Sequence, residues 1–236
     1  MGHTGETTVL RVDEHGARRD ADELVREVRV TVRLHERNLL DATCSPGALR
    51  ELAYGHLLSE GWIYEAGDVA SLSVDEDRFV ASAVLRGGDG ERREARAVTS
   101  SLVVSSEDVL GAVSATLARG VVFRATGGTH VAGVCCVGGA CLIAEDISRT
   151  CALEKALGKA LLAGVDAGRS VLALSSRVPR RFVRKAARAG IPVLAAVSAP
   201  TFEAVAEAER LGVCLCGFVR GDRMNVYSRP ERIGFA

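Results

Sequence analysis

The sequence predicts an α/β protein, and two observations support this fold class. From residue 106 onward, short apolar segments that favour strands alternate with amphipathic segments of helical period. Between residues 28 and 101, segments of period two surround a single helical segment. Strands that alternate with helices are typical of a sheet covered by helices on both faces. We therefore expect a small α+β domain over 27–104, followed by a larger α/β domain over 105–236.

The smaller domain should begin after a polar segment, 1–26, whose few apolar positions predict a mobile tail. Alternation of valines with polar residues over 28–33 predicts a half-exposed strand. Ser45 and Pro46 predict the cap and first position of a helix that ends at Gly61. Further strands are expected at 69–74, 79–85 and 95–101.

The larger domain has a regular order of expected elements. Helices are predicted over 107–117, 150–163, 180–189 and 202–211. Strands are predicted over 121–124, 131–137, 140–143, 171–174, 192–197 and 213–218, with a terminal strand that reaches 227. In sheets of this type, ligands bind beyond the carboxyl ends of the strands.

Loops rich in glycine, hydroxyl groups and arginine follow four of these expected strands. Backbone amides and guanidinium groups suit the phosphates of a nucleotide. The candidate ligand-binding residues are Thr126, Gly127, Gly128, His130, Arg149, Ser175, Arg177, Ser198, Thr201, Phe218, Val219, Arg220, Gly221, Asp222 and Arg223. The competing interpretation is that such loops contain Gly, Ser and Thr in any α/β protein, and the residues alone do not decide between the two.

Taken together and in order, five segments resemble the FdhD family, the accessory proteins of formate dehydrogenase. These segments are 45–61, 126–130, 145–149, 189–201 and 217–227, and the resemblance extends from Val28 to Ile233. The resemblance implies a three-layer, cytidine-deaminase-like fold for the larger domain. It also implies a cytoplasmic homodimer that binds the bis-molybdopterin guanine dinucleotide molybdenum cofactor, with GDP as a second candidate ligand. The implied partners are a cysteine desulfurase, which supplies sulfur for transfer to the cofactor, and formate dehydrogenase or a related molybdoenzyme.

The chain departs from the family pattern at the residues that handle sulfur. In the family, a Cys-Gly-x-Cys-Gly loop follows a Thr/Ser-Ser pair, whereas here Thr99, Ser100 and Ser101 are followed by no such loop. The family's Gly-Arg-His-Asn-Ala segment corresponds to 148–152, which keeps Arg149 and lacks the histidine and asparagine. A hydroxyl group cannot store transferable sulfur. The alternative function is therefore a non-catalytic paralogue that binds the cofactor or a guanine nucleotide, and sulfurtransferase activity is left open.

The cysteines supply the remaining candidates for a catalytic thiol. Seven cysteines in a chain without a leader-like segment favour thiols that are kept reduced. The candidates are Cys151, Cys135, Cys136 and Cys141. Cys151 falls at an expected helix start, where the helix dipole lowers a thiol pKa, and the other three surround a glycine turn. The spacing matches no recognised ligand pattern, so we expect no metal site.

Charge and hydropathy exclude other classes of partner. The chain has 30 Lys and Arg against 30 Asp and Glu, which gives no overall field for nucleic acid or an anionic membrane. No apolar stretch reaches the ~20 residues of a membrane span. Between Ser176 and Ala189 the chain has six cations and no anion. This segment predicts a solvated helix flank, with an anionic partner as the alternative.

Overall fold

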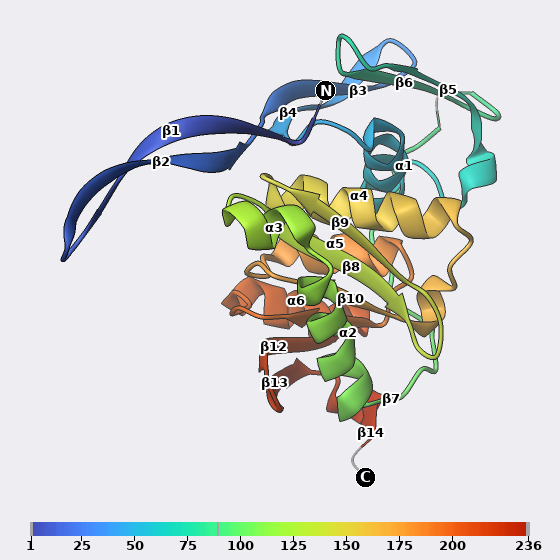
Figure 1. Ribbon diagram of the computed structural model, residues 1–236. Helices are drawn as coiled ribbons and strands as arrows, with labels where there is room; N and C mark the ends of the chain where they lie inside the picture. The colour runs from blue at the N-terminus through green and yellow to red at the C-terminus, as the bar shows by residue number, and fades with distance from the viewer. Residues whose placement is uncertain (1, 89, 235–236) are drawn as a thin grey trace.

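A computed structural model describes residues 2–88 and 90–234, and it contains two main sheets (Figure 1). The smaller sheet has the order β4-β3-β6-β5, and the larger has the order β13-β12-β11-β10-β8-β9. The smaller comprises β3 (Val28–Leu34), β4 (Arg37–Cys44), β5 (Val69–Asp75) and β6 (Val80–Leu85). The larger comprises β8 (His130–Cys136), β9 (Cys141–Asp146), β10 (Ser170–Leu174), β11 (Val193–Ala196), β12 (Cys214–Arg220) and β13 (Arg223–Ser228).

Helices cover both faces of the larger sheet. The helices are α1 (Leu49–Glu60), α2 (Ser106–Ala118), α3 (Val121–Thr126), α4 (Arg149–Leu162), α5 (Arg180–Arg188) and α6 (Phe202–Leu211). Helix α2 packs on one face of the sheet in one apolar cluster, and α4, α5 and α6 pack on the other face in a second cluster. The predicted α/β class, with a sheet covered on both sides, is confirmed. No helix in the described part of the chain is long and apolar enough to cross a membrane.

Strand direction brings several loops to one edge of the larger sheet. Strands β10, β11 and β12 are parallel, whereas β8 runs antiparallel to β10 and pairs with β9 in a hairpin. The start of β8 and the end of β9 therefore lie beside the carboxyl ends of the three parallel strands. We call this side the carboxyl edge and the opposite side the amino edge.

The two sheets are joined by a close crossing of α1 over α4. A Cβ atom added at Gly55 would overlap the carbonyl oxygen of Glu154, and one added at Gly158 would overlap that of Glu51. The helix backbones therefore touch, which only glycine permits at these two positions.

A buried ionic network lies beside this crossing. Glu154 accepts hydrogen bonds from His56 at 3.0 Å and from Lys185 at 2.6 Å, and Lys185 also lies 2.5 Å from Glu60. Burial by itself would raise the pKa of Glu154. The positive charge of Lys185 and the contact with His56 outweigh burial and hold this pKa at about 2.

The network corrects the expectation of a solvated cationic flank for the second half of α5, whereas Arg177 and Arg181 are exposed as expected. Lys185 is buried, Arg184 pairs with Glu207 at 2.6 Å, and Arg188 donates to the carbonyl oxygen of Ser59 at 3.1 Å. Helices α1 and α6 pack against this flank and supply the acids and carbonyl groups that its own sequence lacks.

The N-terminal segment also differs from the mobile tail expected over 1–26. Strands β1 (Thr4–Asp13) and β2 (Gly16–Val25) form an antiparallel hairpin that projects from the body as an arm (Figure 1). Ion pairs join the two strands, including Arg11 with Asp20 at 2.8 Å. The sequence suggests a mobile tail because most residues of both strands are polar or charged. The opposite charges instead face each other across the two strands and pair.

Three local expectations are wrong, two of them because of a distant contact. Residues 121–124 are helical in α3 rather than extended, since the Glu145 carboxylate accepts hydrogen bonds from the first amides of this helix. Residues 95–101 form no strand, because they pair with neither sheet. Ser45 does not cap α1, which starts at Leu49. The Ser45 hydroxyl instead accepts from the amide of Ile147 at 3.1 Å.

The crossing predicts a severe effect of Gly158→Ala. We expect a loss of about 3 kcal/mol in the free energy of unfolding, because the new methyl group has no space between the helices. Urea denaturation followed by the fluorescence of Trp62 measures this loss. Gly111→Ala is the matched control, since Gly111 is also helical but faces open space, and this variant should lose nothing. Equal stability of the two variants would contradict the close crossing.

The low pKa of Glu154 predicts acid sensitivity. Because the folded-state pKa of about 2 lies below the ordinary value of 4.5, the native state binds fewer protons than the unfolded state. The stabilisation is therefore complete above pH 4.5 and is lost as the pH falls towards 2, by on the order of 3 kcal/mol. The free energy of unfolding should depend less on pH in this range for Glu154→Gln than for the exposed control Glu76→Gln. The same dependence in both variants would refute the prediction.

Candidate functional site

Backbone hydrogen bonds tie the carboxyl-edge loops to one another. The Ser175 amide donates to the carbonyl oxygen of Val131 at 3.0 Å, and the Ser175 hydroxyl accepts from the Val131 amide at 3.0 Å. The Phe218 amide donates to the carbonyl oxygen of Ser198 at 3.3 Å. The loops after β10, β11 and β12 and the start of β8 therefore form one continuous surface.

A second connection orders the loops that lead into α5 and α6. The Val178 amide donates to the carbonyl oxygen of Ala199 at 3.1 Å, and the Thr201 amide donates to that of Val178 at 3.0 Å. The Thr201 hydroxyl accepts from the amide of Ala204 at 3.2 Å and caps α6. Because its oxygen serves this cap, Thr201 has a structural role besides its predicted one.

The carboxyl edge concentrates positive charge that no acid compensates. The pKa of Arg149 is lowered, first by partial burial and then by the charges of Arg181 and Arg177. Over residues 2–88 and 90–234, no ion pair involves any of these three arginines. The pKa of His130 is also lowered, by burial and by Arg149, which outweigh the opposite effect of Asp146. A bound anion would relieve this repulsion, so the electrostatics favour a phosphate or carboxylate ligand.

The turn between β12 and β13 forms a second part of the edge. Phe218 has a φ of 52°, in the left-handed region that a non-glycine residue rarely adopts, and its ring is exposed. Arg220 donates through Nε to the carbonyl oxygen of Val197 at 3.1 Å. Together with Gly221, Arg220 lines a cavity of about 240 Å³ beside α2.

The structure separates some of the predicted residues from others. Thr126, Gly127 and Gly128 follow α3 rather than a strand, and a Cβ at Gly128 would lie 2.9 Å from Val25 in the arm. These three residues lie at the carboxyl edge because they directly precede β8, which begins at that edge. His130, Arg149, Ser175 and Arg177 form one group, whereas Val219, Arg220, Gly221, Asp222 and Arg223 belong to the β12–β13 turn.

One exposed aromatic residue was missed by the sequence reasoning. Phe202 is the first residue of α6, directly after Thr201, and it is 85% exposed. At 100° per residue, Phe202 lies on the face of α6 opposite the buried Ala208 and Leu211. The sequence could therefore have indicated Phe202 as a candidate residue for stacking on a flat ligand.

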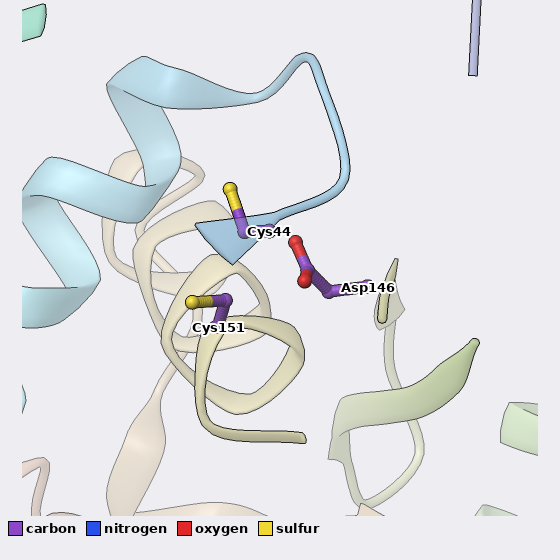
Figure 2. A group of neighbouring side chains, drawn as sticks. All are labelled: Cys44, Asp146 and Cys151. Carbon is purple, nitrogen blue, oxygen red and sulfur yellow. The ribbon is translucent and has the colours of Figure 1, made fainter. Parts of the chain in front are cut away.

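Beneath the carboxyl edge, three residues that could ligate a metal meet where the smaller sheet packs against α4. Figure 2 shows Cys44 at the end of β4, Asp146 at the end of β9 and Cys151 in the first turn of α4. Their ligand atoms lie within 4.8 Å of one another, and all three residues are buried. Asp146 lies 2.7 Å from the Lys155 ammonium and accepts hydrogen bonds from the amides of Ser45 and Ser148. The buried ammonium thus pairs with the one carboxylate of this group.

The two thiols of this group influence each other. The contact with Cys44, together with Ser148, lowers the pKa of Cys151 although burial opposes the change. The same contact and burial raise the pKa of Cys44. The pKa of Cys151 is thus lowered by its neighbours rather than by exposure, since the residue is only 1% exposed.

The other candidate thiols lie at the amino edge. Cys135 and Cys141 face each other across the β8–β9 hairpin and form a disulfide, which corrects the expectation of reduced thiols for this pair. Cys136 is free and half-buried. Strand β8 has seven residues at ~3.3 Å each, so this hairpin lies roughly 20 Å from His130.

The segment that corresponds to the family's sulfur-carrying loop is short and held in place. The Arg232 guanidinium donates to the carbonyl oxygens of Ser100 at 2.7 Å and Leu102 at 3.3 Å. Strand β7 (Val104–Ser105) pairs with β14 (Ile233–Gly234), and α2 starts at once. A cavity of about 600 Å³ adjoins the segment at the amino edge, lined by parts of 93–100, 165–168 and 187–190. It lies away from the arginine cluster of the carboxyl edge.

Comparisons with known proteins agree on one family. A model described as the FdhD/NarQ family matches residues 25–101 and 87–234. A sulfur carrier protein FdhD from Methanothermobacter thermautotrophicus is 34% identical over 246 residues, which cover 97% of this chain and 98% of that protein. Another from Nocardia farcinica is 37% identical over 264 residues, which cover 98% and 95%.

A solved structure shows the same fold. The crystal structure of a putative formate dehydrogenase accessory protein from Desulfotalea psychrophila has a TM-score of 0.86 and 24% sequence identity. The match covers 98% of this chain and 100% of that one.

Proposed function

This chain belongs to the FdhD/NarQ family, and on that premise we propose that it serves the maturation of formate dehydrogenase or a related molybdoenzyme. Its proposed substrate is the bis-molybdopterin guanine dinucleotide molybdenum cofactor. Its proposed task is to carry sulfur from a cysteine desulfurase to that substrate. The names of its relatives as sulfur carriers support this task.

The observation that carries the proposal is the uncompensated arginine cluster at the carboxyl edge. Arg149, Arg177 and Arg181 offer guanidinium groups to the phosphates of a guanine dinucleotide or of GDP. The hydroxyls of Ser175 and Ser198 lie on the same loops. The exposed rings of Phe202 and Phe218 offer flat apolar faces on which a guanine or pterin ring would stack.

The alternative function is a binding module that holds the cofactor or a guanine nucleotide without sulfur transfer. The segment over 98–105 favours this alternative, because it has no cysteine and Arg232 holds it against the body. We retain it as the second candidate function, and a direct test of sulfur loading separates the two.

The remaining proposals concern assembly and classification. We propose a cytoplasmic homodimer in which the arm contacts a second copy, since an isolated two-stranded hairpin is marginally stable and this one exposes Leu10, Val12 and Leu24. The boundary between the domains near residue 104 and the cytidine-deaminase-like classification of the larger domain stay predictions.

The proposed ligand site predicts weaker GDP binding in the double variant Arg149→Gln, Arg177→Gln. Each charged hydrogen bond lost at a phosphate reduces affinity, so we expect a roughly ten-fold to hundred-fold increase in the dissociation constant for GDP. Isothermal titration calorimetry measures it. Arg78→Gln, an exposed arginine on a turn of the smaller sheet, is the control. Unchanged affinity in the double variant would place nucleotide binding away from the carboxyl edge.

The proposed sulfur transfer predicts a covalent adduct. After reduction and incubation with a cysteine desulfurase and L-cysteine, the intact mass should increase by one or more sulfur atoms, and reductant should reverse the increase. Omitting L-cysteine is the control. A mass that does not change would support the non-catalytic alternative.

The proposed dimer predicts a change of assembly on removal of the arm. A chain without residues 4–25 should sediment as a monomer while keeping its far-UV circular dichroism, because the core sheets do not include the arm. Leu10→Ser with Val12→Ser tests the apolar contact with the hairpin still present. If both variants sediment as the full chain does, the arm has no part in assembly.

A further inference from the structure

Few thiols in this protein are open to a partner. Among the described residues, the five free cysteines are Cys44, Cys136, Cys151, Cys214 and Cys216, and all but Cys136 are at most 1% exposed. A thiol that receives sulfur from another protein has to be reached by that protein's own cysteine. The β8–β9 hairpin is therefore the part of the fold where sulfur exchange is sterically open.

The hairpin contains a pair of thiols with different surroundings. Cys141 starts β9, the edge strand of the larger sheet, and is partly exposed. Cys135 lies opposite on β8 and is buried against α2, with its sulfur 3.7 Å from Thr116 Oγ1 and 3.8 Å from the carbonyl oxygen of Ala112. One sulfur is thus accessible from outside and the other is held behind it.

Open space and charges of both signs lie beside the hairpin. Arg119 donates through Nη1 to the carbonyl oxygen of Cys141 at 2.7 Å. A cavity of about 260 Å³ is lined by the three cysteines of the hairpin, by its glycine turn and by residues of α2 that include Glu107 and Asp108. This space leaves room for the cysteine of a partner to approach the thiolate, which is the nucleophile in sulfur exchange.

The hairpin also adjoins the segment where the family's loop would be. The Ser100 hydroxyl donates to the carbonyl oxygen of Gly168 at 2.6 Å, and the Val137 amide donates to that of Arg169 at 2.9 Å. Gly168 and Arg169, which are neighbours in sequence, thus link the Ser100 segment to the hairpin at the amino edge.

We propose that Cys141 and Cys135 form a sulfur-accepting and sulfur-releasing pair, a proposal that rests on the carrier function above. In the reduced pair, the Cys141 thiolate attacks the outer sulfur of a persulfide on a cysteine desulfurase. The new S–S bond forms on Cys141, and the S–S bond of the donor breaks, with the electron pair leaving on the donor thiolate.

Release uses the second thiol. The Cys135 thiolate attacks the inner sulfur of the Cys141 persulfide, which forms the Cys135–Cys141 disulfide and expels hydrosulfide with the electron pair of the broken bond. The disulfide in the structure is the state after release. A dithiol reductant supplies two electrons and two protons to restore the pair.

The test maps sulfur on four chains after reduction and incubation with a cysteine desulfurase and L-cysteine. Cys135→Ser should retain a persulfide on Cys141, because nothing resolves it. The wild type should carry the adduct only at early times, and it should then release hydrosulfide and form the disulfide. Cys141→Ser should lose at least nine-tenths of the adduct, whereas Cys214→Ala, which removes a buried thiol elsewhere, should load and release as the wild type does. Alkylation followed by peptide mass spectrometry locates the adduct, and a methylene-blue assay measures the hydrosulfide.

Each other outcome has a distinct meaning. An adduct that maps to Cys136 or Cys151 and persists in Cys141→Ser would overturn the pair but leave the carrier function intact. No adduct on any of the four chains would overturn both. If the Cys141→Ser chain no longer unfolds cooperatively, its loss of the adduct is not evidence. The Cys135→Ser chain then decides, and the absence of a persulfide on its Cys141 would overturn the proposal.

Discussion

The contact between the backbones of α1 and α4 fixes the rest of the structure. Gly55 and Gly158 let the helices touch, and this brings His56 within hydrogen-bonding distance of the buried Glu154 carboxylate. Lys185 then ties α5 to both helices. Because α4 is fixed along its length, Arg149 and Cys151 in its first turn have defined positions. The buried ionic network beside the crossing thus sets the geometry of the candidate site.

Inserting the antiparallel strand β8 into the larger sheet gives its two edges different chemistry. The carboxyl edge gathers guanidinium groups, hydroxyls and exposed aromatic rings. The amino edge gathers the accessible sulfurs and a large cavity. Direct transfer over the roughly 20 Å between the edges is impossible for a fixed side chain. In the proposed function, released hydrosulfide or an extended substrate has to connect them.

Local patterns predicted most helices and all three parallel strands, because their apolar periods depend on residues within one turn or one strand. The carboxyl-edge loops were also predictable, since they follow those strands. Contacts between residues that are distant in sequence were not predictable in this way. Glu145 makes 121–126 helical, α1 turns the cationic flank of α5 into a buried network, and the pairing of β8 with β9 joins Cys135 to Cys141. Phe202 was within reach of sequence reasoning, because helical periodicity places it opposite the apolar face of α6.

Only three of the 30 cationic side chains are lysines, and each has a partner inside the fold. Lys155 pairs with Asp146, Lys185 with Glu154, and Lys159 donates to the carbonyl oxygen of Ile143. Amine-directed reagents therefore meet a surface whose cations are almost all guanidinium groups. Acylation of Lys155 or Lys185 requires the packing of α1 against α4 and α5 to open, so the rate of labelling at these two amines is a direct measure of that opening.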